Sequence, residues 1–159
     1  TSRLPGLVEI DQSIILEGPY GSFDFLPQKP VDRKQSTGHQ VWIAGGIGIT
    51  PFLARLGELA NTKEKKSANA DLFYCTPNAK SGNFPEQLEA LCLSAGVRLH
   101  RRLTDRDGPL STEDVSFTLQ PGSSVWFCGP AAWGRALGSA LNDKGLPRNA
   151  FHQEAFEFR

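Results

Sequence analysis

A glycine-rich turn is the feature of this sequence that could bind a phosphate group. The apolar run Val41–Ala44 leads into it, and an amphipathic segment follows. The turn contains Gly45, Gly46, Gly48, Thr50 and Pro51. Glycine lets a backbone approach a pyrophosphate closely, and free N–H groups at the start of a helix attract an anion. We therefore expect Thr50 to be the N-cap of a helix with Pro51 in its first position, facing a nucleotide.

The same turn has a second interpretation, because it departs from the usual dinucleotide pattern. Gly46 and Gly48 have the required spacing, but Pro51 stands where the third glycine would be. A tight strand-to-helix turn without any ligand would use glycines in the same way. The position of the turn among the other elements therefore matters.

Apolar runs alternate with amphipathic segments along the rest of the chain. We predict strands over 41–44, 71–76, 97–103, 124–128 and 150–154. We predict helices over 51–61, 84–95 and 131–144, with a short helix near 111–115 in the otherwise irregular segment 104–122. Repeated strand-then-helix units with short links predict an α/β fold. The expected architecture is Rossmann-like: a five-stranded parallel sheet in the order 3-2-1-4-5, with helices on both faces.

Polar and special residues gather where the predicted strands end. Thr76 and Lys80 follow the second strand, the turn 128–130 follows the fourth, and Glu154 ends the fifth. Open α/β sheets bind ligands beyond the carboxyl ends of their strands, where the strand order reverses. In the order 3-2-1-4-5 the first and fourth strands are neighbours, so the glycine turn and the turn 128–130 would flank one crevice. This placement favours a dinucleotide site.

Four residues near the predicted crevice have both a structural and a chemical interpretation. Cys128 is either a small buried side chain at a strand end or a thiol that touches a reactive ring. Phe156 and Phe158 either pack on the core or cover a planar cofactor. Glu154 is either a solvated carboxylate or a hydrogen-bonding group of the site. Sequence position alone leaves these interpretations open.

Composition argues against several classes of partner and site. The 159 residues suit one domain with a fragment of another, and 17 basic residues balance 17 acidic ones, so no nucleic acid partner is expected. Three widely spaced cysteines do not suggest a disulfide framework and fit a reducing compartment. The three histidines lack neighbours at metal-ligand spacing, so we expect no metal site. No nucleophile–base arrangement for hydrolysis is evident.

The first part of the chain does not follow the strand–helix rhythm. Residues 1–27 are expected to be the last strand and junction of a β-barrel, of which only this tail is present. Residues 28–39 read as a polar linker, and residues 40–159 form the predicted α/β domain.

Four motifs occur in the order typical of the ferredoxin–NADP reductase superfamily. They are Glu17-Gly18-Pro19-Tyr20-Gly21, Gly45-Gly46-Ile47-Gly48-Ile49-Thr50-Pro51, Cys128-Gly129-Pro130 and Glu154-Ala155-Phe156. The chain resembles in particular the ferric reductase and NADPH oxidase branch. The resemblance implies an NAD(P)H:flavin oxidoreductase, in which a β-barrel binds FAD and the α/β domain binds NADPH or NADH. Hydride would pass to FAD and electrons onward to haem or ferric iron, so this fragment would be inactive without its FAD domain.

The resemblance also implies roles for individual residues. Three would be catalytic: Cys128 places the nicotinamide, Phe156 stacks on the flavin and Glu154 supports the same pocket. The residues expected to bind cofactors are Gly18, Pro19, Tyr20, Gly21, Gly45, Gly46, Gly48, Thr50, Pro51, Thr76, Lys80, Gly129, Pro130 and Phe158. Family members often end at the aromatic residue, whereas this chain continues past Phe156, so either Phe156 or Phe158 would stack.

Further parts outside the chain are implied as well. The FAD domain of the same full-length chain would be a partner. Haem-bearing helices would make the full-length protein an integral membrane protein, with this domain on the cytoplasmic face. The coenzyme stays open, because Lys80, Arg101 or Arg102 could meet a 2′-phosphate, while no acidic residue ends the second predicted strand to select the ribose of NADH. A non-catalytic module that senses NAD(P) or docks a partner is the alternative function, although it would not need Cys128 or the terminal aromatics.

Overall fold

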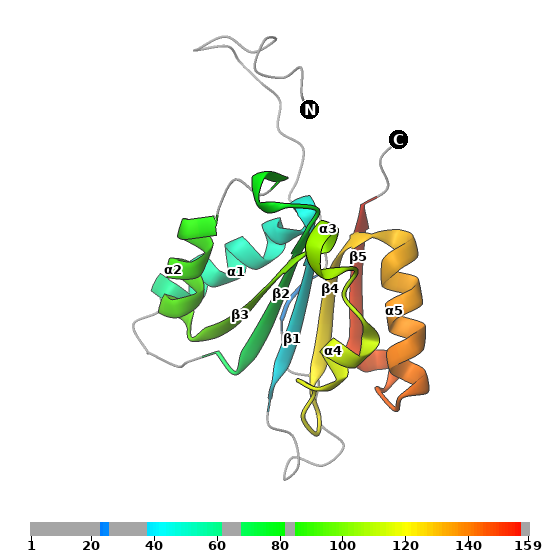
Figure 1. The fold of residues 1–159 in the computed structure, drawn as a ribbon. Helices are drawn as coiled ribbons and strands as arrows, with labels where there is room; N and C mark the ends of the chain where they lie inside the picture. Colours follow the sequence, from blue (N-terminus) through cyan, green and yellow to red (C-terminus); the bar gives the residue numbers. More distant parts are fainter. Residues whose placement is uncertain (1–22, 26–37, 62–67, 82–84, 157–159) are drawn as a thin grey trace, which may run out of the picture.

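Five parallel strands form one sheet in this computed structural model, which describes residues 23–25, 38–61, 68–81 and 85–156. The strands are β1 (Gln40–Gly45), β2 (Ala70–Thr76), β3 (Val97–Leu103), β4 (Ser124–Pro130) and β5 (Phe151–Phe156). Their order is β3-β2-β1-β4-β5, which confirms the prediction. Every neighbouring pair is parallel. The strand order therefore reverses between β1 and β4 (Figure 1).

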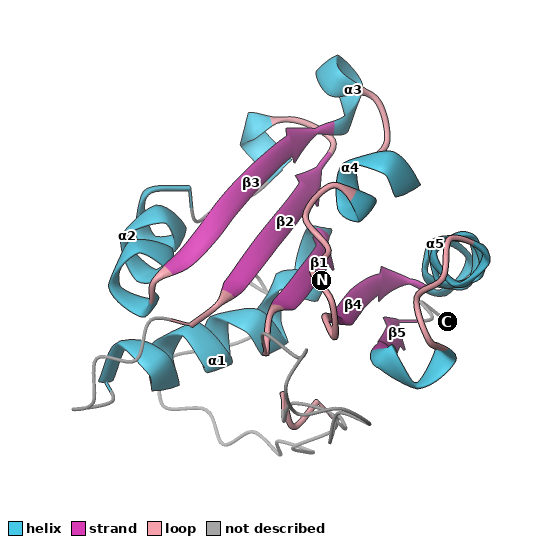
Figure 2. Cartoon of the chain, turned by 90° about the horizontal axis from the view of Figure 1, so that it is seen from below, coloured by secondary structure: helices cyan, strands magenta, loops and turns pink. Residues whose placement is uncertain are grey.

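Helices lie on both faces of the sheet (Figure 2). One face packs against α1 (Thr50–Asn61) and α2 (Pro85–Ala95). The other face packs against α4 (Thr112–Ser116) and α5 (Ala131–Asp143). Shorter turns of helix are η2 (Gly46–Ile49), η3 (Ala79–Ser81), α3 (Thr104–Asp107) and η4 (Arg148–Ala150). The Rossmann-like α/β architecture is confirmed.

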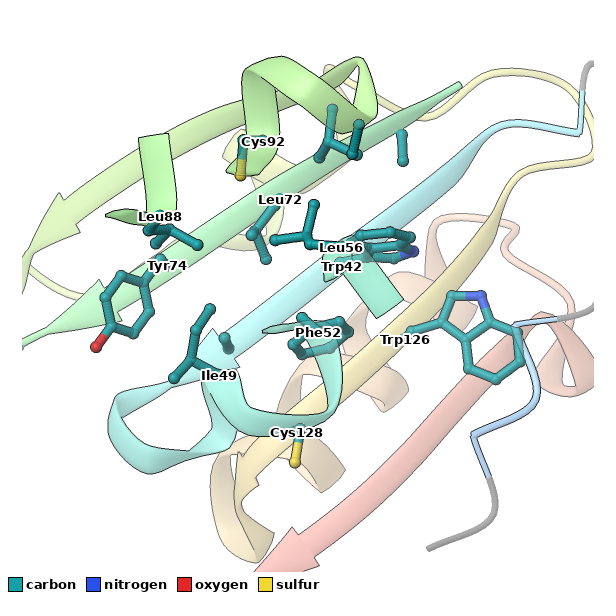
Figure 3. Close-up of a cluster of buried hydrophobic side chains, with 14 of the residues drawn as sticks. Trp42, Ile49, Phe52, Leu56, Leu72, Tyr74, Leu88, Cys92, Trp126 and Cys128 are labelled. Carbon is teal, nitrogen blue, oxygen red and sulfur yellow. The ribbon is translucent and has the colours of Figure 1, made fainter. Parts of the chain in front are cut away.

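Side chains of the central strands alternate between two hydrophobic clusters. From β1, Trp42 packs in the cluster beneath α1, while Val41 and Ile43 pack in the cluster beneath α5. This alternation follows from the two-residue repeat of a strand, and it explains why a strand buried on both faces reads as a continuous apolar run. Figure 3 shows the first cluster, in which the rings of Trp42 and Phe52 are stacked with 5.7 Å between centroids.

Two local predictions about helices need correction. Helical winding begins at Gly46 in η2 and continues into α1, so Thr50 already has helical angles of φ −56° and ψ −46°. Thr50 is therefore not an N-cap, and Pro51 is not in the first helical position. The segment 104–122 contains α3 as well as the short helix that we predicted. That predicted helix, α4, begins at Thr112, and its N-cap Ser111 forms a reciprocal capping box with Asp114.

The turn between β1 and α1 lies directly against the main chain of β4. A Cβ atom at Gly48 would overlap the carbonyl oxygen of Cys128. Gly48 is buried, and backbone on both sides of the contact leaves no flexible side chain that could move away. The close approach of the two turns at the point of strand reversal therefore depends on the missing side chain at Gly48.

A buried carboxylate joins the amino-terminal parts of the strands, far from this turn. Asp71 accepts hydrogen bonds from His39 Nε2 at 2.8 Å, His100 Nε2 at 2.6 Å and the Arg98 guanidinium at 2.9 Å. Burial alone would raise the pKa of Asp71, but the hydrogen bonds from His100 and His39 and the charge of Arg98 outweigh it, so this pKa is lowered. The ionised carboxylate therefore stabilises the fold.

His39 also contacts a serine, which gives a serine–histidine–aspartate series that we did not predict. The His39 Nδ1 atom lies 2.9 Å from Ser123 Oγ, which itself accepts a hydrogen bond from the Gln120 N–H group at 2.8 Å. Ser123 is only 4% exposed and His39 only 1%. Because the series is buried at the amino-terminal end of the sheet, we assign it a structural role.

Replacing Asp71 with asparagine should lower the free energy of unfolding by about 3 kcal/mol at pH 7, because it breaks a buried charged network. The folded-state pKa is lowered, so this stabilisation is present above the unfolded pKa, near 3.8, and is lost as pH falls through the folded value. Urea unfolding at pH 7 and at pH 3 measures the difference between the two proteins. Asp143→Asn, at an exposed position, is the control and should change stability by less than about 0.5 kcal/mol. A difference between wild type and Asp71→Asn that is the same at both pH values would contradict the assignment.

Replacing Gly48 with alanine should destabilise the chain by about 2 kcal/mol, because the added methyl group overlaps backbone. Gly57→Ala is the matched control within α1. An added Cβ there meets nothing within 4 Å, so alanine should raise stability by up to about 1 kcal/mol. Denaturant unfolding followed by circular dichroism compares the two. Equal effects would show that the contact with Cys128 is not tight.

Candidate functional site

A cavity of about 590 Å³ opens at the carboxyl ends of the central strands. Its lining residues come from the carboxyl ends of β1, β2 and β4, the turn after β1, the segment after β3 and the first turn of α5: Gly45, Gly46, Ile47, Cys75, Thr104, Pro109, Leu110, Gly129, Pro130 and Trp133. The predicted turn 128–130 is the end of β4, and together with the glycine turn it flanks one cavity at the place that the strand order predicted. A crevice at a point of strand reversal is where open α/β sheets bind their ligands.

Gly45 and Gly46 have different structural reasons for being glycine. A Cβ at Gly45 would lie 2.9 Å from the ring of Trp133, so the missing side chain lets the indole approach the turn. Gly46 has φ +55°, which favours glycine, and nothing lies within 4 Å of an added Cβ there. The space beside Gly46 therefore belongs to the cavity rather than to the core.

Trp133 forms an aromatic wall of the cavity, and the sequence analysis missed it. Its indole packs edge-on against Phe127, with 4.8 Å between ring centroids. Cys75, Pro109 and Leu110 also line the cavity and were not predicted from the sequence, whereas Thr104 lies where special residues were expected after the third strand. Trp133 could have been identified from the sequence, because it lies in the first turn of the helix predicted directly after the turn 128–130. The walls are mostly apolar, which suits a flat ring.

Arg102 holds the loop that carries Pro109 and Leu110. Its guanidinium donates hydrogen bonds to the main-chain oxygens of Asp107 (2.9 Å), Gly108 (3.0 Å) and Pro109 (3.1 Å). It also pairs with Asp114 at 2.9 Å. Arg102 therefore shapes one side of the cavity through the loop.

An acidic residue lies beside the loop that follows β2, where the sequence suggested none. Asn78 Nδ2 donates to Asp105 Oδ2 at 3.3 Å, and the Asp105 N–H group donates to the Pro77 carbonyl at 2.9 Å. Asp105 directly follows Thr104, which lines the cavity. Among the predicted residues of this region, Thr76 is buried and Lys80 is exposed. The loops after β2 and β3 thus form one rim with a carboxylate on it.

Cys128 lies on the opposite side of the sheet from the cavity walls formed by Trp133 and Leu110. Its side chain is fully buried in the cluster beneath α1, near Phe52 (Figure 3). Burial, together with the charge of Glu154, raises the pKa of the Cys128 thiol to about 12. The thiol is therefore neutral at pH 7 and is covered by protein.

Glu154 lies beside Cys128 but is engaged with a distant part of the chain. The two residues are paired in register between β4 and β5. Glu154 Oε1 accepts a hydrogen bond from the Phe23 N–H group at 2.9 Å. The main chain of Phe156, in β5, is in register with Pro130 of β4, while the placement of the Phe156 side chain is outside the described part of the structure. Residues 18–21 and Phe158 also lie outside the described residues.

Comparisons with known proteins identify reductases as relatives, although no family model matches the chain. It is 28% identical over 149 residues to the carnitine monooxygenase reductase subunit of Escherichia coli (strain K12), covering 94% of this chain and 42% of the relative. It is 32% identical over 121 residues to the tert-butanol monooxygenase / tert-amyl alcohol desaturase reductase subunit of Aquincola tertiaricarbonis, covering 74% and 33%. A flavohemoprotein of Bacillus cereus (strain ATCC 10987 / NRS 248) is 29% identical over 131 residues, with coverage of 73% and 32%. The chain thus spans less than half the length of these relatives.

Solved structures share the fold at lower sequence identity. A flavohemoglobin from Malassezia yamatoensis, with bound FAD and haem, matches with a TM-score of 0.69 and 20% identity, over 92% of this chain and 39% of that one. A cytochrome P450 reductase of Amycolatopsis matches with a TM-score of 0.62 and 24% identity, over 87% and 42%. The cytochrome b5 reductase domain of Ulva prolifera nitrate reductase has a TM-score of 0.62 and 21% identity, over 73% and 48%.

These relatives correct one expectation and define the family. The full-length protein was expected to be an integral membrane protein, and this is wrong, because the matched relatives are reductase subunits and flavohemoproteins. In the part of the chain that the structure describes, no helix combines the length and the apolar character needed to span a bilayer. The ferric reductase branch is likewise not shown by these likenesses. By sequence and fold together, the chain belongs to the ferredoxin–NADP reductase superfamily.

Proposed function

We propose that this chain is the NAD(P)H-binding domain of a flavin-dependent oxidoreductase that passes electrons to a haem or iron centre. The observation that carries the proposal is the cavity at the point of strand reversal, flanked by the glycine turn and by the carboxyl end of β4. Its volume of about 590 Å³ lies within the range of small-molecule sites. The relatives named as reductase subunits and flavohemoproteins support the same reaction class.

The cavity and its rim suit the different parts of a dinucleotide. The apolar walls around Trp133 and Leu110 would take a flat base, because an indole stacks well on another ring. The main-chain N–H groups at Gly46 and Ile47, at the start of the helical stretch, would receive the pyrophosphate. Bound NAD(P)H supplies a hydride, and the residues of this chain hold and orient it.

The flavin and the final acceptor are proposed to lie mainly outside this chain. FAD would be bound by a further domain of the full-length chain, with the expected junction residues 18–21 and Phe158 contributing to its site. The names of the relatives favour an oxygenase component or a haem domain as the electron acceptor over free ferric iron. Cys128 and Glu154 would lie on the flavin side of the sheet, away from the base-binding cavity.

We further propose NADH as the coenzyme, because a carboxylate lies beside the cavity. Asp105 is exposed, is held by Asn78 and by the loop after β2, and directly follows the cavity residue Thr104. A carboxylate accepts hydrogen bonds from ribose hydroxyls, whereas it repels a 2′-phosphate. Of the three basic residues considered above, Arg102 holds the neighbouring loop and Arg101 pairs with Glu89 at 3.1 Å, while Lys80 is exposed.

Titration of the chain with NADH should produce saturable amide NMR shifts at Gly46, Ile47 and Thr104 and at the indole of Trp133. Trp133→Ala should weaken binding about tenfold, because one stacked base contributes roughly 1–3 kcal/mol. Phe117→Ala is the control, because Phe117 is 89% exposed and is not among the cavity residues, and its binding constant should not change. Absence of any shift at millimolar NADH would sink the proposed function for the chain as it stands.

The preference for NADH over NADPH gives a separate test of the role of Asp105. NADH should bind about tenfold more tightly than NADPH, since like charges on Asp105 and a 2′-phosphate repel each other. Asp105→Asn should remove most of this preference by improving the binding of NADPH. Fluorescence titrations with both coenzymes, at low ionic strength, measure the ratio. Asp143→Asn serves as the control for net charge, and an equal change in both variants would contradict a local role of Asp105.

A further inference from the structure

Residues Phe23–Phe25, which we call the clip, are pinned to the domain at both ends. The Phe23 N–H group donates to Glu154 Oε1 at 2.9 Å, near the carboxyl end of β5. The Phe25 carbonyl accepts from Gln40 Nε2 at 2.8 Å, at the amino end of β1. These two anchors are on β5 and β1, and β4 lies between those strands. The clip therefore crosses a face of the sheet.

Aromatic contacts fix the clip on the α1 side of the sheet. The ring of Phe23 packs edge-on against Trp126, with 5.3 Å between centroids. The ring of Phe25 lies 5.1 Å from Trp126 and 5.3 Å from Trp42. Trp126 also stacks on His152 of β5, with 3.9 Å between ring centroids. The clip thus belongs to the hydrophobic cluster that also contains Cys128.

The docked clip has a strained backbone. Phe25 has φ +51°, the one positive value among the described residues other than glycine. A bulky residue rarely adopts this conformation and keeps it only when its surroundings impose it. Here the burial of the Phe25 ring, which is 7% exposed, imposes it. The strain opposes docking, so it lowers the free energy needed to release the clip.

The geometry points to Glu154 as a positioning residue: by holding the Phe23 N–H group, it keeps the clip over the Cys128 side of the sheet. Release of the clip would open this side of the sheet to the second ring of a dinucleotide whose first ring lies in the cavity near Trp133. That last step rests on the proposed function, which places Cys128 and Glu154 on the flavin side of the sheet. The Cys128 side chain is 0% exposed with the clip docked, so it can be reached only when part of its cover moves.

Thiol labelling separates this role of Glu154 from an effect of its charge. The whole chain is treated with N-ethylmaleimide, and modification of Cys75, Cys92 and Cys128 is followed separately by peptide mass spectrometry. Glu154→Ala should label at Cys128 at least tenfold faster than wild type, with Cys75 and Cys92 unchanged. Glu154→Gln also removes the charge but keeps an oxygen that can accept from Phe23, so it should stay within about threefold of wild type.

Three results would overturn the inference. Equal rates in Glu154→Ala and Glu154→Gln would assign the effect to charge, and an unchanged rate in Glu154→Ala would show that the carboxylate does not hold the cover. A uniform rise at all three thiols would show that Glu154 supports the whole fold.

A second variant, Phe25→Ala, should also expose Cys128 selectively, because it removes the ring that imposes the strained backbone. Labelling of Cys128 in this variant at the slow wild-type rate would contradict the role of the clip.

The same protein distinguishes failure of this inference from failure of the proposed function. If wild type shows no NADH-induced NMR shifts at the cavity, the proposed function fails, whatever the labelling rates are. If wild type binds NADH while Cys128 is labelled at the same rate in all variants, the role of the clip is contradicted and the proposed nucleotide site is not.

Discussion

The contact between the β1–α1 turn and the main chain of β4 is the constraint on which the candidate site depends. At Gly48 the turn touches the carbonyl of Cys128, and at Gly45 it touches the ring of Trp133. Because neither position has room for a side chain, the ends of β1 and β4 are held together at the point where the strand order reverses. The cavity lies beside this contact, so its shape follows from backbone packing more than from any single polar residue.

The sheet separates two sets of residues that the sequence analysis treated as one crevice. Gly46 and Trp133 face the cavity near α5, whereas Cys128 and Glu154 lie on the side of α1. The two-residue repeat of a strand causes this separation, because Gly129 reaches the cavity while its neighbour Cys128 points into the core. A dinucleotide that used both sets would have to cross the edge of the sheet above the glycine turn.

Much of the fold could be predicted from sequence, because apolar runs and glycine stops mark strands that are buried on both faces. The parallel sheet with helices on both faces followed from the repeated strand–helix units, whereas the strand order was taken from the doubly wound architecture. The start of the helix at Gly46 could not be predicted, since Thr50 and Pro51 look like a typical helix start. The hydrogen-bond partners of Arg102 and Asp71 could not be predicted either, because these bonds form only when segments that are distant in the sequence meet in the fold. Asp105 was missed for the same reason: it lies beside Asn78 through the pairing of β2 with β3.

The burial of all three cysteines has a consequence for the chemical durability of the chain. Burial raises the pKa values of Cys75 and Cys128 to about 12 and that of Cys92 to about 11. Peroxides and other oxidants attack the thiolate, and even for Cys92 that form is on the order of one molecule in ten thousand at pH 7. Protonation and burial together therefore protect all three thiols from oxidation.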